Sequence, residues 1–307
     1  MSEGKKILIT EVGPRDGFQN IDSTKKIIPT EVKIRYIERL ISAGVKSIQY
    51  TSFVSPKAIP QLADAQEVTA NILPKYPDLD LFALVPNFRG AKDAVEAGLK
   101  KVAYVVSFSK SHNLANINRT HDQSLAEFKE IRARYPNLQI SLNFATTFGC
   151  PFEGKYENDK KFINFVKDYY EAGMTDAVLC DTIGIADPEQ VRRFIRAFKA
   201  AFPKVGLTMH FHDTRGLGMV NSFIAIDEGV TRLESTLGGL GGCPFAPGAS
   251  GNLSTEDLIW ALTSAGYDTG ISFSQLVALA KEEHQQISGI YSGHQLIIQN
   301  PTPPVSK

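Results

Sequence analysis

The chain has 307 residues, of which 43% are hydrophobic and 21% charged, values that are ordinary for a globular protein. Lysine plus arginine and aspartate plus glutamate balance at 33 each, so no net charge would attract nucleic acid or a membrane surface. Three cysteines and an N-terminus without an apolar signal segment favour a cytoplasmic protein without a disulfide framework.

Apolar runs alternate with helical patterns along almost the whole chain. Nearly continuous apolar segments, typical of buried parallel strands, occupy residues 7–12, 47–53, 79–85, 101–108, 139–146, 176–181, 206–212 and 231–237. Apolar periodicity and capping signals predict helices at residues 29–43, 61–73, 90–98, 123–134, 159–172, 188–201, 220–228, 255–265 and 273–287. We expect a polar loop at residues 109–120 and a loose, proline-containing tail at residues 300–307.

This alternation predicts an α/β protein, a (β/α)₈ TIM barrel with a C-terminal helical extension. We expect a single domain over residues 1–307, with the barrel at about 6–265 and the extension at 266–299. The alternative is an open doubly wound sheet, but the first strand is not followed by the glycine fingerprint of that fold.

The strongest chemical signal is the run Met209–Thr214 at the end of the seventh predicted strand. Side chains alternate along a strand, so His210 and His212 point to the same face. Two imidazoles so placed are good ligands for a first-row metal, and two hydrogen-bonded core histidines are the alternative. A catalytic cation would require at least one oxygen ligand from another part of the chain.

Oxygen ligands can come from other strand ends, because a barrel gathers functional residues at the C-terminal ends of its strands. Asp16 follows the first strand, and Asn252 lies in the glycine-rich segment 238–252 after the eighth. Strands one, seven and eight adjoin in a closed barrel, so both residues can converge with the two histidines. Such a nitrogen and oxygen site suits Mg²⁺, Mn²⁺ or Zn²⁺. A turn-capping role is the alternative for Asp16.

Two further residues are candidates for charge stabilisation and proton transfer. Arg15 could bind an anionic substrate or stabilise a developing enolate, and a solvated surface arginine is the alternative. Cys243 lies in the glycine-rich segment, which favours a mobile thiol able to act as an acid or base. Cys180, inside a predicted strand, is interpreted as a packing residue.

These residues lie in motifs that resemble the 3-hydroxy-3-methylglutaryl-CoA lyases of the DRE-TIM metallolyase superfamily. The motifs follow one another over nearly all of residues 6–290, at 11–17, 51–57, 149–154, 181–184, 210–214 and 238–257. The resemblance implies a divalent metal on Asp16, His210, His212 and Asn252, Mg²⁺ or Mn²⁺ before Zn²⁺. It also implies that Arg15 is a catalytic cation and that Cys243 is the thiol of a glycine-rich lid.

The resemblance further implies cleavage of a 3-hydroxy-3-methylglutaryl-CoA-like substrate to acetyl-CoA and a 3-keto acid such as acetoacetate. We expect Arg15, Gln19 and Thr182 to contact an acyl-CoA or related hydroxy acid, and Asn116 to contact its CoA side. We also expect a homo-oligomer, a dimer. The alternatives are a Claisen-type acyl-CoA synthase, a lyase with a different hydroxyacyl substrate, and an acyl-CoA-binding relative without activity.

One departure from the family pattern bears directly on catalysis. Gln49 stands where the family's catalytic glutamate is expected, and Tyr50 beside it replaces a small residue. The amide keeps the shape of the carboxylate but removes a charge and a proton acceptor. Charges at Asp22 and Lys110 are inverted, and Ala115 replaces a basic residue. We therefore expect weak activity on the methylglutaryl substrate and better activity on another hydroxyacyl thioester.

Overall fold

The computed structural model describes residues 5–242 and 251–304. Its main strands are β1 (Leu8–Glu11), β2 (Ser47–Ser52), β3 (Asp80–Val85), β4 (Lys101–Ser107), β5 (Gln139–Ala145), β8 (Asp176–Asp181), β9 (Gly206–Phe211) and β10 (Arg232–Ser235). They form a closed barrel in the order β1-β10-β9-β8-β5-β4-β3-β2. The predicted (β/α)₈ TIM barrel is thus confirmed.

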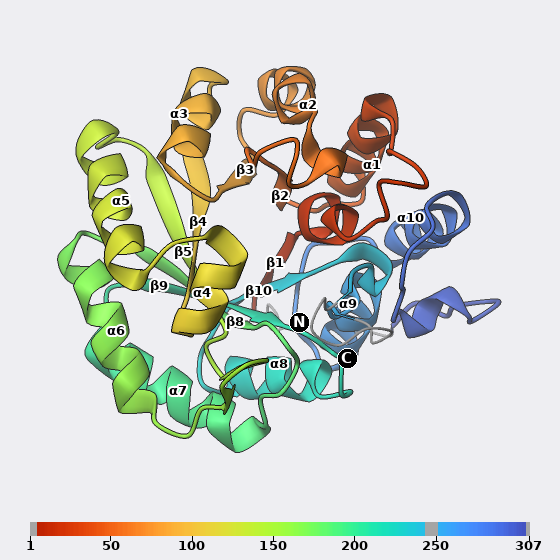
Figure 1. Ribbon diagram of the computed structural model, residues 1–307. Coiled ribbons are helices and arrows are strands. Elements are labelled where there is room, and N and C mark those ends of the chain that lie inside the picture. The colour runs from red at the N-terminus through yellow and green to blue at the C-terminus, as the bar shows by residue number, and fades with distance from the viewer. Residues whose placement is uncertain (1–4, 243–250, 305–307) are drawn as a thin grey trace. The chain divides into compact units, whose positions relative to one another are not determined.

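Helices follow the strands along the chain (Figure 1). They are α1 (Thr30–Ser42), α2 (Ala65–Ile72), α3 (Phe88–Glu96), α4 (Lys110–Ile117), α5 (His121–Arg134), α6 (Asp159–Glu171), α7 (Pro188–Ala201), α8 (Gly218–Asp227), α9 (Thr255–Ser264) and α10 (Phe273–Gln286). By its internal contacts the chain divides into a first unit, residues 1–81 and 231–307, and a second unit, residues 82–230. The expectation of a single domain stays a prediction.

In the first unit, β1 pairs in parallel with both β10 and β2. Helix α1 turns Tyr36, Ile37 and Leu40 inward, as its apolar spacing predicts. Helix α10 packs beside α1, and an ion pair between Arg39 and Glu282 joins them. The C-terminal helical extension is therefore part of the packing of this unit.

In the second unit, β4, β5, β8 and β9 pair in parallel and in sequence. An aromatic cluster fills the space between β5 and α6. The ring of Phe144 meets those of Phe162, Phe165 and Tyr169 edge-on, with centroids 5.8, 6.0 and 5.8 Å away. Edge-to-face contacts of this kind add to the free energy gained by burying large rings.

The predicted polar loop at residues 109–120 is wrong, because residues Lys110–Ile117 form helix α4. Ser109 caps this helix by accepting a hydrogen bond from the His112 amide at 3.0 Å, and Asn118 ends it in the left-handed conformation. Buried Asn113 accepts a hydrogen bond from the Ser107 amide at 2.8 Å. Polar side chains that hold a helix in place look like loop residues in a sequence pattern.

The short hairpin of β6 (Gly149–Cys150) and β7 (Gly154–Lys155) was likewise not predicted.

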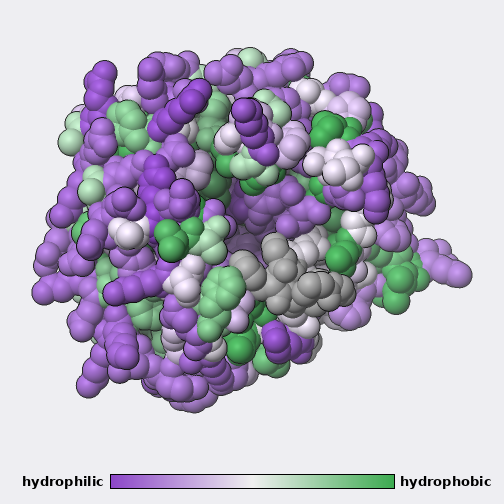
Figure 2. All heavy atoms as spheres, viewed as in Figure 1, coloured by the Kyte–Doolittle hydropathy of each residue, from purple (hydrophilic) through white to green (hydrophobic). Residues whose placement is uncertain are grey.

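One face of the molecule is mostly polar. Figure 2 shows hydrophilic residues over most of the face in view, with hydrophobic residues scattered among them. Within residues 5–242 and 251–304, no helix combines the length and the apolar character that a membrane span requires.

Removal of the Phe162 ring should destabilise the protein strongly, because the ring is fully buried and contacts three other aromatic rings. We expect Phe162→Ala to lower the free energy of unfolding by about 3–5 kcal/mol, measured by urea denaturation. Leu114→Ala is the control, since Leu114 is 54% exposed, and it should cost less than about 0.5 kcal/mol. Equal losses in the two variants would contradict the aromatic core described for this unit.

Candidate active site

A single buried carboxyl group organises the end of β1 in the first unit. Glu11 has no exposed surface, and its Oε1 accepts hydrogen bonds from the amides of Gly13 and Leu237 at 2.7 and 2.9 Å. The Thr255 hydroxyl donates to Oε2 at 2.7 Å. Glu11 thereby joins the ends of β1 and β10 to the first turn of α9, and it positions the short π-helix, Gly13–Gly17, that follows β1.

Asp16 in this π-helix lies at the centre of a polar cluster. Its Oδ1 accepts hydrogen bonds from the Arg15 guanidinium and from Nε2 of Gln19, the latter at 2.7 Å. Its Oδ2 accepts one from Nδ2 of Asn252 at 2.8 Å. Nε of Arg15 donates to Oε1 of Gln49. The structure therefore brings together five of the predicted site residues in the first unit.

Arg15 is not a surface residue. Its side chain is only 7% exposed, which excludes the alternative of a solvated surface arginine. Two neighbours orient the guanidinium, Gln49 through Nε and Asp16 through Nη1. A buried and oriented cation interacts more strongly with a nearby negative charge than a solvated one does.

Two buried atoms in this cluster have no hydrogen-bond partner among the described residues, Nε2 of Gln49 and Oδ1 of Asn252. The two side chains are 0% and 1% exposed. A buried polar group without a partner costs about 1–3 kcal/mol, so a ligand that supplies the partner gains affinity. The amide oxygen can only accept and suits a cation, whereas the amide N–H suits an acceptor oxygen.

The second unit contributes the histidine pair. His210 and His212 are both buried on β9, and their ring centroids lie 5.2 Å apart. This agrees with the alternation expected for a strand, in which residues two apart share a face. On the neighbouring strand β8, the register partner of His210 is Cys180, whose side chain is buried.

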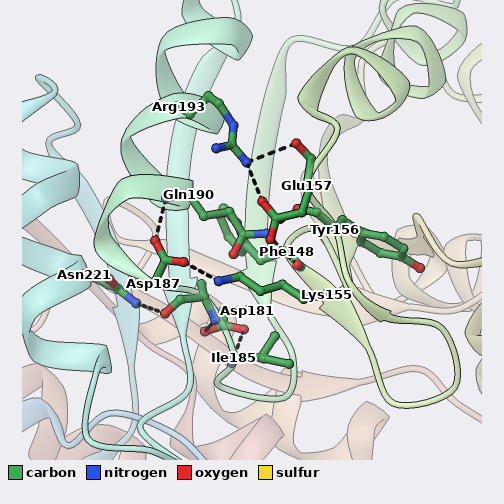
Figure 3. Close-up of polar contacts among 11 residues, drawn as sticks. Phe148, Lys155, Tyr156, Glu157, Asp181, Ile185, Asp187, Gln190, Arg193 and Asn221 are labelled. Atoms are coloured by element: carbon green, nitrogen blue, oxygen red, sulfur yellow. Dashed lines mark hydrogen bonds and ion pairs between the residues drawn. The ribbon is translucent and has the colours of Figure 1, made fainter.

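The turn after β8 is held by Asp181. Its two carboxylate oxygens accept hydrogen bonds from the amides of Ile185 and Ala186 at 2.9 and 3.1 Å (Figure 3). Burial raises the pKa of Asp181 to about 6, although these two bonds oppose the shift. Thr182, a predicted substrate contact, accepts a hydrogen bond from the Thr146 amide at 2.7 Å. The motif at residues 181–184 therefore also has a structural role, as a closed turn at the end of the strand.

The hairpin β6–β7 is attached to the start of α7. Asp187 caps α7 by accepting a hydrogen bond from the Gln190 amide at 2.8 Å, and it forms an ion pair with Lys155 (Figure 3). Nε2 of Gln190 donates to the carbonyl groups of Phe148 and Tyr156 at 2.7 and 2.6 Å. These bonds fix the segment that carries the motif at residues 149–154.

Glu153 in this segment remains ionised well into the acidic range. Burial alone would raise its pKa, but hydrogen bonds from Ser111, Tyr156 and Ser109 outweigh burial and lower the pKa to about 2. Sγ of Cys150 lies 2.9 Å from Oγ of Ser109. The motif at residues 149–154 thus contacts the start of α4. The sequence does not reveal this contact, because the two segments are far apart along the chain.

Two predicted site residues are not placed in these clusters. Asn116 is exposed on α4, and no contact supports its expected role on the CoA side. Cys243 lies outside the described residues. Its function as the thiol of the glycine-rich segment stays a prediction.

Sequence reasoning missed two buried acidic residues of the first unit, Glu256 and Glu283. Oε2 of Glu256 accepts a hydrogen bond from the Gly238 amide at 2.9 Å. Burial raises the pKa of Glu256 to about 8 and that of Glu11 to about 7. Burial also raises the pKa of Glu283 well above its usual value, and the two other carboxyl groups add to this shift. Glu256 lies within the motif at residues 238–257 but was not singled out there, and Glu283 lies outside the motifs, because both occupy what look like ordinary polar positions of helices.

The chain is similar to several characterised proteins. The HMGL-like family model matches residues 6–282. Over 275 residues the chain is 41% identical to the mitochondrial hydroxymethylglutaryl-CoA lyase of Bos taurus, which covers 89% of this chain and 83% of the relative. The crystal structure of the Bacillus subtilis HMG-CoA lyase matches with a TM-score of 0.89 at 38% identity, covering 96% of this chain and 98% of that one. The structure of an HMG-CoA lyase of Acinetobacter baumannii, solved with coenzyme A and 3-methylmalate, matches with a TM-score of 0.83 at 42% identity. The match covers 90% of this chain and 89% of that one.

The raised pKa values predict that the free energy of unfolding falls as the pH rises from about 4.5 to about 8. In this range the folded protein keeps protons on Glu11 and Glu256 that the unfolded chain has lost. The stabilising contribution is complete below pH 4.5 and is lost as the pH passes through the folded pKa values. Glu256→Gln stays neutral and should flatten the dependence of Tm on pH between pH 5 and 8.

The control for this experiment is Glu31→Gln, because Glu31 is exposed at the start of α1. Its Tm curve should run parallel to that of the wild type. A Glu256→Gln curve as steep as the wild-type curve would show that Glu256 does not titrate in this range.

Proposed function

The chain belongs to the HMGL-like family of carbon–carbon lyases, and we propose that it cleaves a 3-hydroxy-3-methylglutaryl-CoA-like thioester to acetyl-CoA and a 3-keto acid such as acetoacetate. The observation that carries this proposal is the buried cluster around Asp16, in which a guanidinium and two unpartnered amide atoms surround one carboxylate. The A. baumannii relative was solved with coenzyme A, which supports an acyl-CoA substrate.

We propose that Asp16, His210, His212 and Asn252 hold a divalent cation, Mg²⁺ or Mn²⁺ before Zn²⁺. Asp16 and the two histidines make up a group of side chains that could bind a metal ion. The unpartnered, buried Oδ1 of Asn252 fits the fourth position, because its amide nitrogen is already bonded to Asp16. A bound cation would lower the pKa of the substrate's 3-hydroxyl group.

The groups of the chain itself would orient the substrate and stabilise charge. The 3-hydroxyl loses its proton, the C2–C3 bond breaks, and the electron pair of that bond passes into the enolate of acetyl-CoA. Arg15 would offset the negative charge of this enolate, since it is a buried cation held in place by Gln49 and Asp16. By family resemblance Cys243 would return a proton to C2, which completes acetyl-CoA.

Other site residues would act around this centre. Gln19 donates to the Asp16 carboxylate at 2.7 Å, so it would orient that ligand as well as border the substrate. Thr182 and Asn116 are further proposed substrate contacts. A cytoplasmic dimer is the proposed state of the protein.

The metal assignment predicts that His210→Ala/His212→Ala loses both metal and turnover. After chelation and reconstitution with Mn²⁺, we expect this double variant to bind the ion at least about 10²-fold more weakly than the wild type, measured by calorimetry. His284→Ala is the control, because His284 is exposed on α10, and it should bind as the wild type does. Full metal retention by the double variant would exclude the histidines as ligands.

The thiol assignment predicts that Cys243→Ser lowers kcat by roughly 10²-fold while metal binding is unchanged. The matched control is Cys180→Ser, whose thiol is buried in β8 and has no proposed part in proton transfer. Acetyl-CoA release under saturating substrate measures both variants. Wild-type turnover in Cys243→Ser would remove this thiol from the mechanism.

A further inference from the structure

The amide of Gln49 is held in one orientation inside the first unit. Gln49 lies on β2, and its side chain has no exposed surface. Its Oε1 accepts a hydrogen bond from Nε of Arg15, so Nε2 takes no part in the contact with the guanidinium. Nε2 finds no acceptor among the described residues. A donor is therefore fixed in a buried position with nothing in this part of the chain to receive its protons.

Arg15 has spare donors beside the same amide. Its Nε donates to Gln49 and its Nη1 donates to Asp16. Its Nη2 makes no hydrogen bond to another described residue. Asp16 is the only carboxylate paired with this guanidinium among the described residues, and Gln19 and Asn252 share it. A glutamate at position 49, as the family pattern has it, would place a second carboxylate beside Arg15, whereas glutamine leaves Asp16 as the one carboxylate paired with it in the described residues.

A carboxylate is the ligand group that satisfies both features. Its oxygens only accept hydrogen bonds, its charge strengthens a hydrogen bond from the remaining guanidinium N–H groups, and its planar shape can receive an amide N–H and a guanidinium N–H together. A methyl group in that place would leave the amide of Gln49 unpaired. A neutral carbonyl would satisfy the amide, but its hydrogen bond to the guanidinium would be weaker than that of a charged acceptor.

We infer that Gln49 is a specificity-determining residue and that the preferred substrate carries a carboxylate at C3 in place of the methyl group. This inference rests on the proposed lyase function, in which a cation held in part by Asp16 would act on the 3-hydroxyl group. Hydrogen bonds link Asp16 to Arg15 and Arg15 to Gln49, so a substrate whose 3-hydroxyl group was held at Asp16 would have the substituents of C3 beside the amide of Gln49.

The substrate is then a 3-carboxy-3-hydroxyglutaryl thioester, and the same cleavage accounts for all its atoms. The proton leaves the 3-hydroxyl, the C2–C3 bond breaks, and C2 receives a proton to give acetyl-CoA. C3 becomes the keto carbon of a four-carbon 2-oxo dicarboxylate. No oxidant, reductant or further reactant takes part.

The experiment compares kcat/KM for two thioesters, 3-hydroxy-3-methylglutaryl-CoA and 3-carboxy-3-hydroxyglutaryl-CoA, with acetyl-CoA measured by mass spectrometry. The proteins are the full-length, metal-loaded wild type, Gln49→Glu and Gln49→Met. We expect the wild type to prefer the carboxylate substrate by roughly 10–10²-fold, the range of one charge-assisted hydrogen bond. Gln49→Glu should reverse this preference, because its carboxylate repels the added charge and pairs with Arg15.

Gln49→Met keeps the approximate shape of the side chain without its donors. It should lose the preference mainly through a higher KM for the carboxylate substrate, because the contact forms on binding. A purely structural role of Gln49 would instead lower the turnover of both substrates by the same factor, and that result would overturn the inference.

Two further outcomes separate this inference from the proposed function. If the wild type cleaves the methylglutaryl substrate faster and Gln49→Glu gains nothing on it, the lyase function stands and the role of Gln49 is wrong. If the wild type releases acetyl-CoA from neither thioester, the lyase function fails and the inference fails with it.

Discussion

The buried carboxyl group of Glu11 is the interaction on which the candidate site depends most. Its three hydrogen bonds hold the turn after β1, the segment after β10 and the first turn of α9 around one side chain. These are the segments that carry Arg15, Asp16 and Asn252. A change that removed this acceptor would leave three buried donors unpaired, so the geometry around Asp16 follows from the burial of Glu11.

Support and ligand binding are assigned to different atoms in the site. Asp16, Arg15 and Gln49 orient one another through side-chain hydrogen bonds, while one amide atom each of Gln49 and Asn252 stays unsatisfied. In the second unit Asp181 closes a backbone turn instead of facing outward with an unpaired carboxylate. Such a division keeps the groups that bind ligands rigid before the ligand arrives, which lowers the reorganisation needed for catalysis.

Local patterns in the sequence were sufficient to predict the barrel. Continuous apolar strands and periodic helices repeat at a spacing that only a few folds use, and the strand ends then pointed to Asp16 and to the histidine pair. Helix α4 was missed because its stabilising contacts come from Ser109 and Asn113, which are typical loop residues. Long-range pairings, such as that of Arg15 with Gln49 across 34 positions, leave no local pattern, and the buried state of Glu283 depends on such packing too.

The central claim is a carbon–carbon cleavage that passes through the enolate of acetyl-CoA. The most direct test incubates the metal-loaded protein with 3-hydroxy-3-methylglutaryl-CoA or its 3-carboxy analogue in D₂O and analyses the thioester product by mass spectrometry. The account predicts acetyl-CoA with one deuterium in its methyl group, together with an equal amount of keto acid. Release of free coenzyme A and the intact hydroxy acid, without acetyl-CoA, would show thioester hydrolysis and contradict the account.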